Sequence, residues 1–87
     1  MPVVNNAVDA GVIVRQKLIE LNGPLGVVMF QIGSVNLINY PKNNSKPTWR
    51  VSCSYYSNLA GTQRVSKEVY VDQATGEVVD LNGTDHA

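Results

Sequence analysis

Apolar residues recur with helical spacing near the N-terminus and with the alternation of β-strands along the rest of the chain. When successive residues are placed 100° apart, the apolar residues of segment 7–22 gather on one broad face, which predicts an amphipathic helix. That face is formed by Ala7, Val8, Val12, Val14, Leu18, Ile19 and Leu21. Asn5 or Asn6 can cap the start of this helix, and Gly23 followed by Pro24 closes it.

Strands are expected over residues 27–38, 49–57, 64–72 and 77–81. The polar run 39–47, with two prolines and three asparagines, predicts an exposed loop, and 82–87 predicts a frayed tail. One helix can cover one face of such a sheet, so we expect a single α+β domain over residues 1–87. Its architecture would be a two-layer sandwich of the N-terminal helix on a three- or four-stranded antiparallel sheet whose other face is open.

Two β-branched segments flank a short polar turn within residues 69–79, a pattern that predicts a β-hairpin. Asp72 can turn its carboxylate back onto the amides of the turn. Gly76 can adopt the positive φ at which the next strand restarts. We therefore assign both residues structural roles in the turn.

The same stretch carries the tripeptides Tyr-Val-Asp at 70–72 and Thr-Gly-Glu at 75–77. Together with the N-terminal helix and the Trp-led strand 49–55, these residues make the chain resemble the PepSY-like domains. The resemblance implies a non-catalytic module of protease propeptides and envelope proteins, which binds or restrains a protease or another protein partner. It names no catalytic residue. Segment 27–47 is longer than its usual counterpart in those domains, and their usual export signal is not seen.

Charge and composition narrow the class of partner. A formal net charge of zero removes the general electrostatic attraction toward nucleic acid. No window approaches the roughly 20 apolar residues of a membrane span, so we expect a soluble protein with neither nucleic-acid binding nor membrane insertion. The single Cys53 cannot form an internal disulfide and leaves the compartment open. An extracytoplasmic origin would require that a signal segment has been removed.

Residue types that carry chemistry are scarce, so no catalytic residue, metal ligand or cofactor is expected. His86, the sole histidine, lies next to the C-terminus, where a disordered bystander is favoured over a member of a catalytic triad. Cys53 lies on the apolar side of its strand, which favours a buried filler over a nucleophile. The carboxylates Asp72, Glu77 and Asp80 lack the spacing of a calcium-binding loop.

The open face of the sheet is the main candidate for partner binding. Arg50, Tyr56, Glu68 and Tyr70 fall on it by alternation, among small polar residues. Tyrosines in such surroundings suit protein recognition, and they equally suit any half-hydrated sheet.

Charges are segregated along the chain. Bases occupy positions 42 to 67 without an intervening acid, and acids then occupy positions 68 to 85 without a base. One explanation is that basic and acidic strands pair across the sheet, each exposed pair contributing about 0.2–1 kcal/mol. The alternative is a dipole that steers a partner.

The expected function is that of a binding or regulatory module, which restrains a protease or another protein through its exposed sheet face or an edge strand. It would act by occupancy, without chemistry, so an enzyme is not expected. The alternative is a self-associating structural protein, a homodimer through the open sheet face or the Ile13 side of the helix. A small-ligand carrier is a third hypothesis and would need a deep apolar pocket between helix and sheet.

Overall fold

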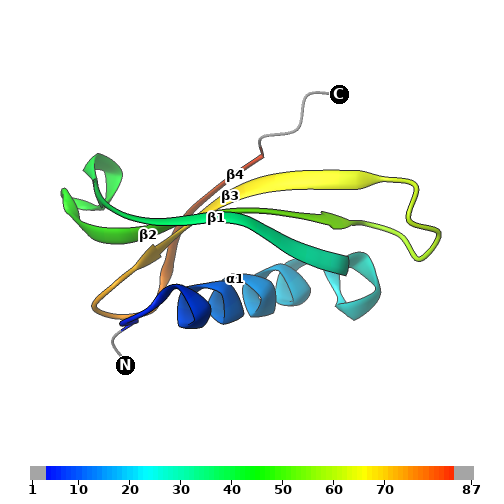
Figure 1. Ribbon diagram of the computed structural model, residues 1–87, viewed down its shortest axis with the longest axis horizontal. Coiled ribbons are helices and arrows are strands. Elements are labelled where there is room, and N and C mark those ends of the chain that lie inside the picture. The colour runs from blue at the N-terminus through cyan, green and yellow to red at the C-terminus, as the bar shows by residue number, and fades with distance from the viewer. Residues whose placement is uncertain (1–3, 84–87) are drawn as a thin grey trace.

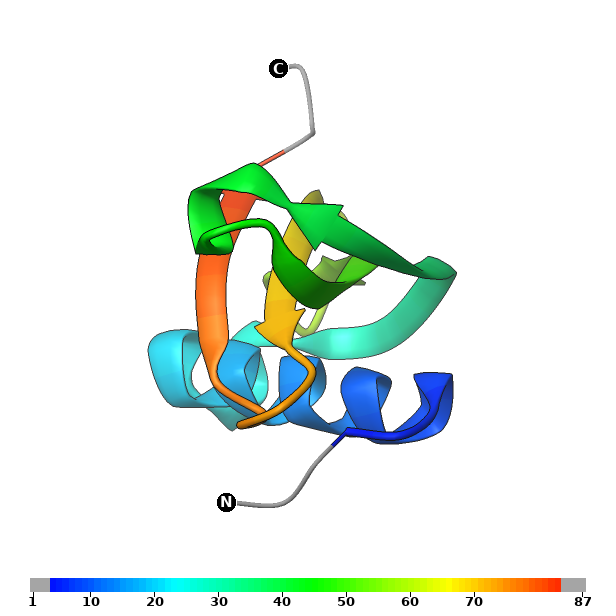
Figure 2. The same ribbon diagram turned by 90° about the vertical axis from the view of Figure 1, so that its left-hand side faces the viewer.

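The computed structural model describes residues 4–83. Its elements are α1 (Ala7–Asn22), η1 (Pro24–Gly26), β1 (Val28–Tyr40), η2 (Pro41–Asn43), β2 (Lys46–Tyr56), β3 (Arg64–Asp72) and β4 (Val78–Gly83), where η marks a 3₁₀ turn. The strands form one antiparallel sheet in the order β1-β2-β3-β4. α1 lies across one face of this sheet and contacts all four strands (Figure 1, Figure 2). The expected α+β fold of one N-terminal helix on a four-stranded antiparallel sheet is confirmed.

Local sequence places both ends of α1 where the pattern predicts them. The side-chain oxygen of Asn6 accepts a hydrogen bond from the amide of Asp9 at 2.9 Å, which satisfies one of the amides left unpaired at a helix start. At the other end Gly23 adopts a φ of 82°, and its amide donates to the carbonyl of Ile19. Neither α1 nor any other helix within residues 4–83 is long and apolar enough to cross a bilayer.

The face that α1 turns toward the sheet differs from the expected one. Its buried residues are Ala10, Gly11, Val14 and Leu18. Four members of the expected face are instead exposed, namely Ala7, Val8, Val12 and Leu21. The small residues Ala10 and Gly11 let the helix approach the sheet closely, a contribution that a count of large apolar side chains overlooks. Ile13, which was not part of the expected apolar face, is partly buried and packs against the core.

The core lies between α1 and the two central strands. Val14 and Leu18 form one buried cluster with Val51 of β2 and with Val69 and Val71 of β3. Each of these side chains is at most 1% exposed. Full burial of a valine or leucine stabilises a protein by about 1.5–3 kcal/mol, so this cluster is the main source of cohesion between the two layers.

The segment before α1 is hydrogen-bonded to β2 and to the residue that follows β3. The indole Nε1 of Trp49 donates to the carbonyl of Val4 at 2.9 Å, and the amide of Val4 donates to the carbonyl of Gln73 at 2.8 Å. Val4 itself is buried. The start of the helix is therefore anchored to β2 and to the turn that follows β3.

The expected loop at 39–47 is much shorter in the structure. β1 continues to Tyr40 and β2 begins at Lys46, so η2 and two further residues make the whole connection. Asn44 reverses the chain in a left-handed conformation, with φ 56° and ψ 34°, which asparagine tolerates better than most residues. The polarity of the segment misled the prediction, because an open sheet face is as polar as a loop.

The remaining boundaries are close to those expected. β3 has the predicted bounds of 64 and 72, whereas β4 extends two residues into the expected tail 82–87. Residues 84–87 lie outside the described part of the chain. The prediction for His86 falls among them and is therefore not tested.

Candidate functional site on the open sheet face

The side chain of Asp72 holds the turn between β3 and β4. Its Oδ2 accepts hydrogen bonds from the amide and the hydroxyl of Thr75, at 3.1 and 2.8 Å. Gly76 has a φ of 75°, and its amide donates to the Asp72 carbonyl at 2.8 Å. Asp72 and Gly76 thus occupy the turn positions that the sequence pattern assigns to them.

Asp72 also ties this turn to the connection between β1 and β2. Asn43 Nδ2 donates to Asp72 Oδ1 at 2.9 Å and to Thr48 Oγ1 at 3.0 Å. Thr48 is fully buried, and its hydroxyl donates to the carbonyl of Lys46. Hydrogen bonds from Asn43 and Thr75 hold the pKa of Asp72 below its ordinary value, because they favour the charged carboxylate. At this end of the open face the polar side chains of Thr48 and Asp72 are therefore buried and hydrogen-bonded.

Two tyrosines from strands that are not neighbours stack on the open face. The rings of Tyr40 on β1 and Tyr70 on β3 are 6° from parallel, with centroids 4.0 Å apart. The Tyr40 hydroxyl donates to Asp80 Oδ2 on β4, and Lys42 Nζ lies 3.8 Å from the same oxygen. This hydrogen bond raises the pKa of Tyr40 to about 12 and lowers the pKa of Asp80, since it requires a protonated phenol and favours an ionised carboxylate.

Arg50 and Glu68 form an ion pair beside this stack. Arg50 Nη2 lies 2.5 Å from Glu68 Oε2, and the hydroxyl of Tyr70 donates to Glu68 Oε1 at 3.0 Å. The hydrogen bond from Arg50 lowers the pKa of Glu68, and the same bond raises the pKa of Arg50. Burial, followed by the hydrogen bond to Glu68, raises the pKa of Tyr70. We call the five residues Tyr40, Arg50, Glu68, Tyr70 and Asp80 the tyrosine–carboxylate cluster.

Three of the four residues predicted to bind a partner belong to this cluster, and the fourth does not. Arg50, Glu68 and Tyr70 are engaged with one another, and Tyr70 is only 7% exposed because its ring stacks on Tyr40. Tyr56 lies six positions from Arg50 along β2, which corresponds to about 20 Å at the rise of a strand. The open face therefore has two distinct regions.

The ion pairs Arg50–Glu68 and Lys42–Asp80 join the basic part of the chain to the acidic part. Pairing across the sheet, one of the two explanations for the segregated charges, is thereby observed. These two pairs leave fewer unpaired charges that could steer a partner toward the protein.

Sequence reasoning missed Tyr40, Asn43 and Thr48, which complete this end of the face. All three lie at or next to the segment that was expected to be a loop, so none was placed on the sheet. The pair Asn43-Asn44 was the available signal, because asparagine is favoured where a tight connection needs a left-handed residue.

Beyond the cluster, the open face carries small polar side chains. Ser34 of β1 lies opposite Ser52 of β2, and Ser54 lies opposite Ser66 of β3. We call these four residues the serine patch. Arg64 Nη2 donates to Ser54 Oγ at 3.2 Å, and the other three hydroxyls have no hydrogen-bond partner within residues 4–83. A shallow depression of about 230 Å³ lies over Ser52, Ser54, Ser66 and Arg64.

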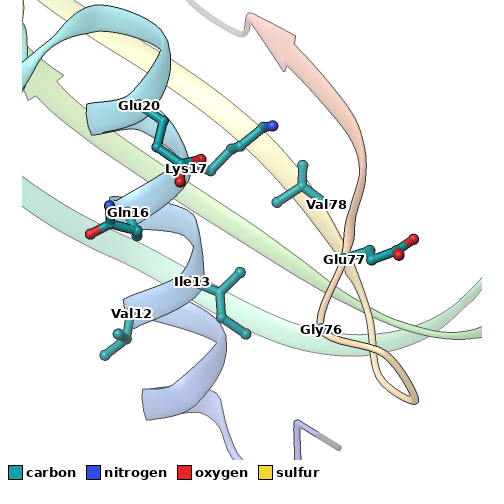
Figure 3. Close-up of a pocket in the computed structure, with 8 residues that line it drawn as sticks. All are labelled: Val12, Ile13, Gln16, Lys17, Glu20, Gly76, Glu77 and Val78. Carbon is teal, nitrogen blue, oxygen red and sulfur yellow. The ribbon is translucent and has the colours of Figure 1, made fainter. Parts of the chain in front are cut away.

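A larger groove lies between α1 and the turn that joins β3 to β4 (Figure 3). It has a volume of about 640 Å³, with Ile13 and Val78 as apolar walls and Lys17, Glu20 and Glu77 as charged side chains. The groove is open and lies on the flank of the helix. Beneath α1, buried apolar side chains of the helix and of the central strands pack against one another, where a small-ligand carrier would need a deep apolar pocket.

Cys53 is placed in the sheet as a buried side chain, 5% exposed. Its thiol donates a long hydrogen bond of 3.7 Å to the carbonyl of Lys67. Burial raises the pKa of Cys53 to about 11, so the reactive thiolate is scarce at neutral pH. Among the described residues, no three side chains of the types His, Cys, Asp and Glu gather as metal ligands.

Comparison with family models, curated proteins and solved structures gave no match. The similarity to PepSY-like domains therefore rests on the N-terminal helix, strand 49–55 and turn 69–79 alone, and it stays a resemblance.

Proposed function

We propose that this protein is a non-catalytic binding module that holds a protein partner against the serine patch of its open sheet face. The proposal rests on the difference between two regions of that face, the tyrosine–carboxylate cluster and the serine patch. In the tyrosine–carboxylate cluster Glu68 is paired with Arg50, and Asp80 is paired with Tyr40 and with Lys42 from outside the cluster. By contrast, three of the four hydroxyls in the serine patch are unpaired within the described chain. Small side chains there allow a partner to approach the sheet closely and to exchange hydrogen bonds with those hydroxyls.

The two ends of the patch suit this role in different ways. At one end, the cluster is already ordered by the Tyr40–Tyr70 stack and the Arg50–Glu68 pair, so binding beside it requires little further loss of side-chain freedom. At the other end, Tyr56 presents an aromatic ring on the same face, and tyrosine is enriched in protein interfaces. A partner spanning the patch would thus meet a rigid polar border and an aromatic anchor.

Two further observations support this proposal. The first favours binding without catalysis, and the second favours a protease as the class of partner. Cys53, the one cysteine, is buried with a raised pKa and so is poorly suited to nucleophilic attack. The hairpin 69–79, which carries the resemblance to PepSY-like domains, joins β3, the strand that holds Ser66, to β4. In this proposal the module restrains a protease by covering part of its surface.

The test compares the wild-type chain with Ser52→Arg and with Val79→Arg. Ser52 lies within the patch, and an arginine there blocks close approach; Val79 lies on β4 and is 38% exposed, so its variant adds the same charge elsewhere. Each purified chain is immobilised, incubated with host extract, and its retained proteins are quantified. We expect a protein, retained by wild type and by Val79→Arg, whose retention falls about tenfold or more with Ser52→Arg.

The retained protein is then purified and its proteolytic rate measured with each chain added. Wild type and Val79→Arg should lower that rate, and Ser52→Arg should not. Equal retention by all three chains would contradict the serine patch as the binding surface. A retained protein without proteolytic activity would contradict only the proposed partner class.

A further inference from the structure

β1 forms one edge of the sheet, and its 13 residues include no charged residue and no proline. Proteins usually protect such an edge with lysine, proline, bulges or a covering segment, because its unpaired N–H and C=O groups can pair with another chain. Irregularities in β1 lie between Val28 and Gln31 and between Ile32 and Ser34. From Ser34 to Tyr40 the register with β2 is regular, so this stretch presents a continuous, uncharged outer edge.

The direction of its backbone groups follows from the neighbouring strand. The carbonyl of Pro47 on β2 accepts from the amide of Gln73, so Pro47 directs its backbone toward β3 and away from β1. Pro47 lies opposite Asn39. Opposed residues in an antiparallel pair alternate between those that exchange hydrogen bonds and those that do not. Asn39, Leu37 and Val35 therefore direct their N–H and C=O groups to the free edge.

We propose that a second copy of this chain pairs with that edge, β1 against β1 in antiparallel orientation, about a two-fold axis at Leu37. Leu37 is the middle residue of the regular stretch 34–40, so an axis there uses the whole stretch. Leu37 then faces its own copy, and Val35 faces Asn39 of the second copy. All three residues with outward backbone groups become paired, and each pair exchanges two hydrogen bonds.

The chemistry of β1 fits a copy of itself. A two-fold axis places each residue near it close to the same residue of the second copy. A charged side chain near the axis would therefore be repelled by the like charge of the second copy. β1 contains none. Leu37 lies opposite Trp49, on the α1 side of the sheet, and is 47% exposed. Pairing would cover this apolar surface with the same residue from the second copy.

The opposite edge of the sheet is protected by its own side chain. β4 has six residues, and its register with β3 is interrupted next to Tyr70. The carboxylate of Asp80 accepts from the amide of Leu81 at 2.9 Å, and Asp80 adds a charge to the strand. Only β1 therefore combines a regular edge, the absence of charge and unpaired backbone groups within the described chain.

The pairing leaves the serine patch free. An antiparallel pair of identical edges has its two-fold axis perpendicular to the sheet, so both copies present their open faces on the same side. The dimer would carry two serine patches on one continuous surface. The proposed dimer does not depend on the proposed binding function, and either proposal can fail without the other.

The first experiment measures mass by light scattering during size-exclusion chromatography over about a hundredfold range of concentration. We expect the wild-type chain to be a dimer and Leu37→Lys and Leu37→Glu each to be monomers, because like charges then meet at the axis. An equimolar mixture of the two variants should return to a dimer, since opposite charges then meet. Val79→Lys, which adds the same charge to the other edge, should remain a dimer. Circular dichroism checks that each variant is folded.

Amide hydrogen exchange then locates the interface. In the wild type the amides of Val35, Leu37 and Asn39 should be protected, and in Leu37→Lys they should exchange at least about tenfold faster. Asn36 and Ile38, which bond to β2, should stay protected in both. A wild-type chain that is monomeric throughout would overturn the proposal. So would a dimer in which the three outward amides exchange freely, as expected for contact through the open face.

Discussion

Among single residues, Asp72 carries the largest share of the polar contacts that hold the turn. Its carboxylate accepts from Asn43 and twice from Thr75, and the residue is 6% exposed. In Asp72→Asn one acceptor oxygen is replaced by an amide NH2 group, which is itself a donor and faces donors, so the free energy of unfolding should fall by about 1.5–3 kcal/mol. Urea denaturation measures this change. Glu77→Gln, which removes an exposed carboxylate nearby, should change it by less than about 0.5 kcal/mol, and equal losses would count against this account.

Cys53 offers a second test at this scale. Because burial raises its pKa to about 11, a thiol reagent at pH 8 should label the native protein slowly. In denaturant the pKa returns to about 8.5, and labelling should become at least about a hundredfold faster. The absorbance of the leaving group that the reagent releases on labelling measures both rates. Rapid labelling of the native protein would show that the strand around Cys53 opens readily.

At the scale of elements, the close approach of α1 to β1 depends on Gly11. A Cβ at this position would lie 2.4 Å from Cδ1 of Ile32, a side chain that is 43% exposed and free to turn outward. Alanine stabilises a helix interior by about 0.5–1 kcal/mol relative to glycine. Gly11→Ala should therefore stabilise the protein by less than that amount in the wild-type background, because Ile32 must move.

The matched background is Ile32→Val, which lacks the δ-methyl group. There Gly11→Ala should stabilise by the full amount of about 0.5–1 kcal/mol. Thermal and urea unfolding of the four chains give the coupling between the two positions. Zero coupling would mean that α1 and β1 are farther apart at Gly11 than the structure places them.

The same helix shows what sequence could and could not predict about an element. Its ends were predictable because Asn6 and Gly23 act through bonds to neighbours within a few positions. Its buried face could not be predicted, because Val8, Ala10 and Val12 do not all fall on one side of the helix, so the apolar pattern does not single out one face. Contact with the sheet determined which face is buried, and that face includes the small residues at 10 and 11.

For the molecule as a whole, the class of fold followed from alternation and turn residues, whereas the division of the open face did not. Strand alternation correctly placed Arg50 and Glu68 on one face. It could not show that Tyr40 reaches Tyr70 and Asp80, because those contacts span 30 and 40 positions and depend on the short connection at η2. Pairing at that distance is set by the register of several strands together.

The tyrosine–carboxylate cluster, together with Asp72 of the turn between β3 and β4, gives the whole molecule a stability that falls at both extremes of pH. The pKa values of Glu68, Asp72 and Asp80 are lowered in the folded state, so their contribution is present above about pH 4 and is lost as the pH falls through the folded pKa values. The pKa of Tyr40 is raised to about 12, so its contribution is complete below about pH 10 and is lost as the pH rises toward 12.

Tyr40→Phe separates the hydrogen bond from the stack, because phenylalanine keeps the ring but has no proton to lose. We expect the free energy of unfolding of this variant to fall less steeply than that of the wild type between about pH 10 and 12. It should also fall less steeply below about pH 4, since Asp80 loses the donor that lowers its pKa. Tyr56→Phe removes a hydroxyl outside the cluster, keeps the Tyr40–Asp80 hydrogen bond and is the matched control. Urea denaturation across the pH range measures all three chains, and identical slopes would mean that the Tyr40–Asp80 hydrogen bond contributes nothing to stability in solution.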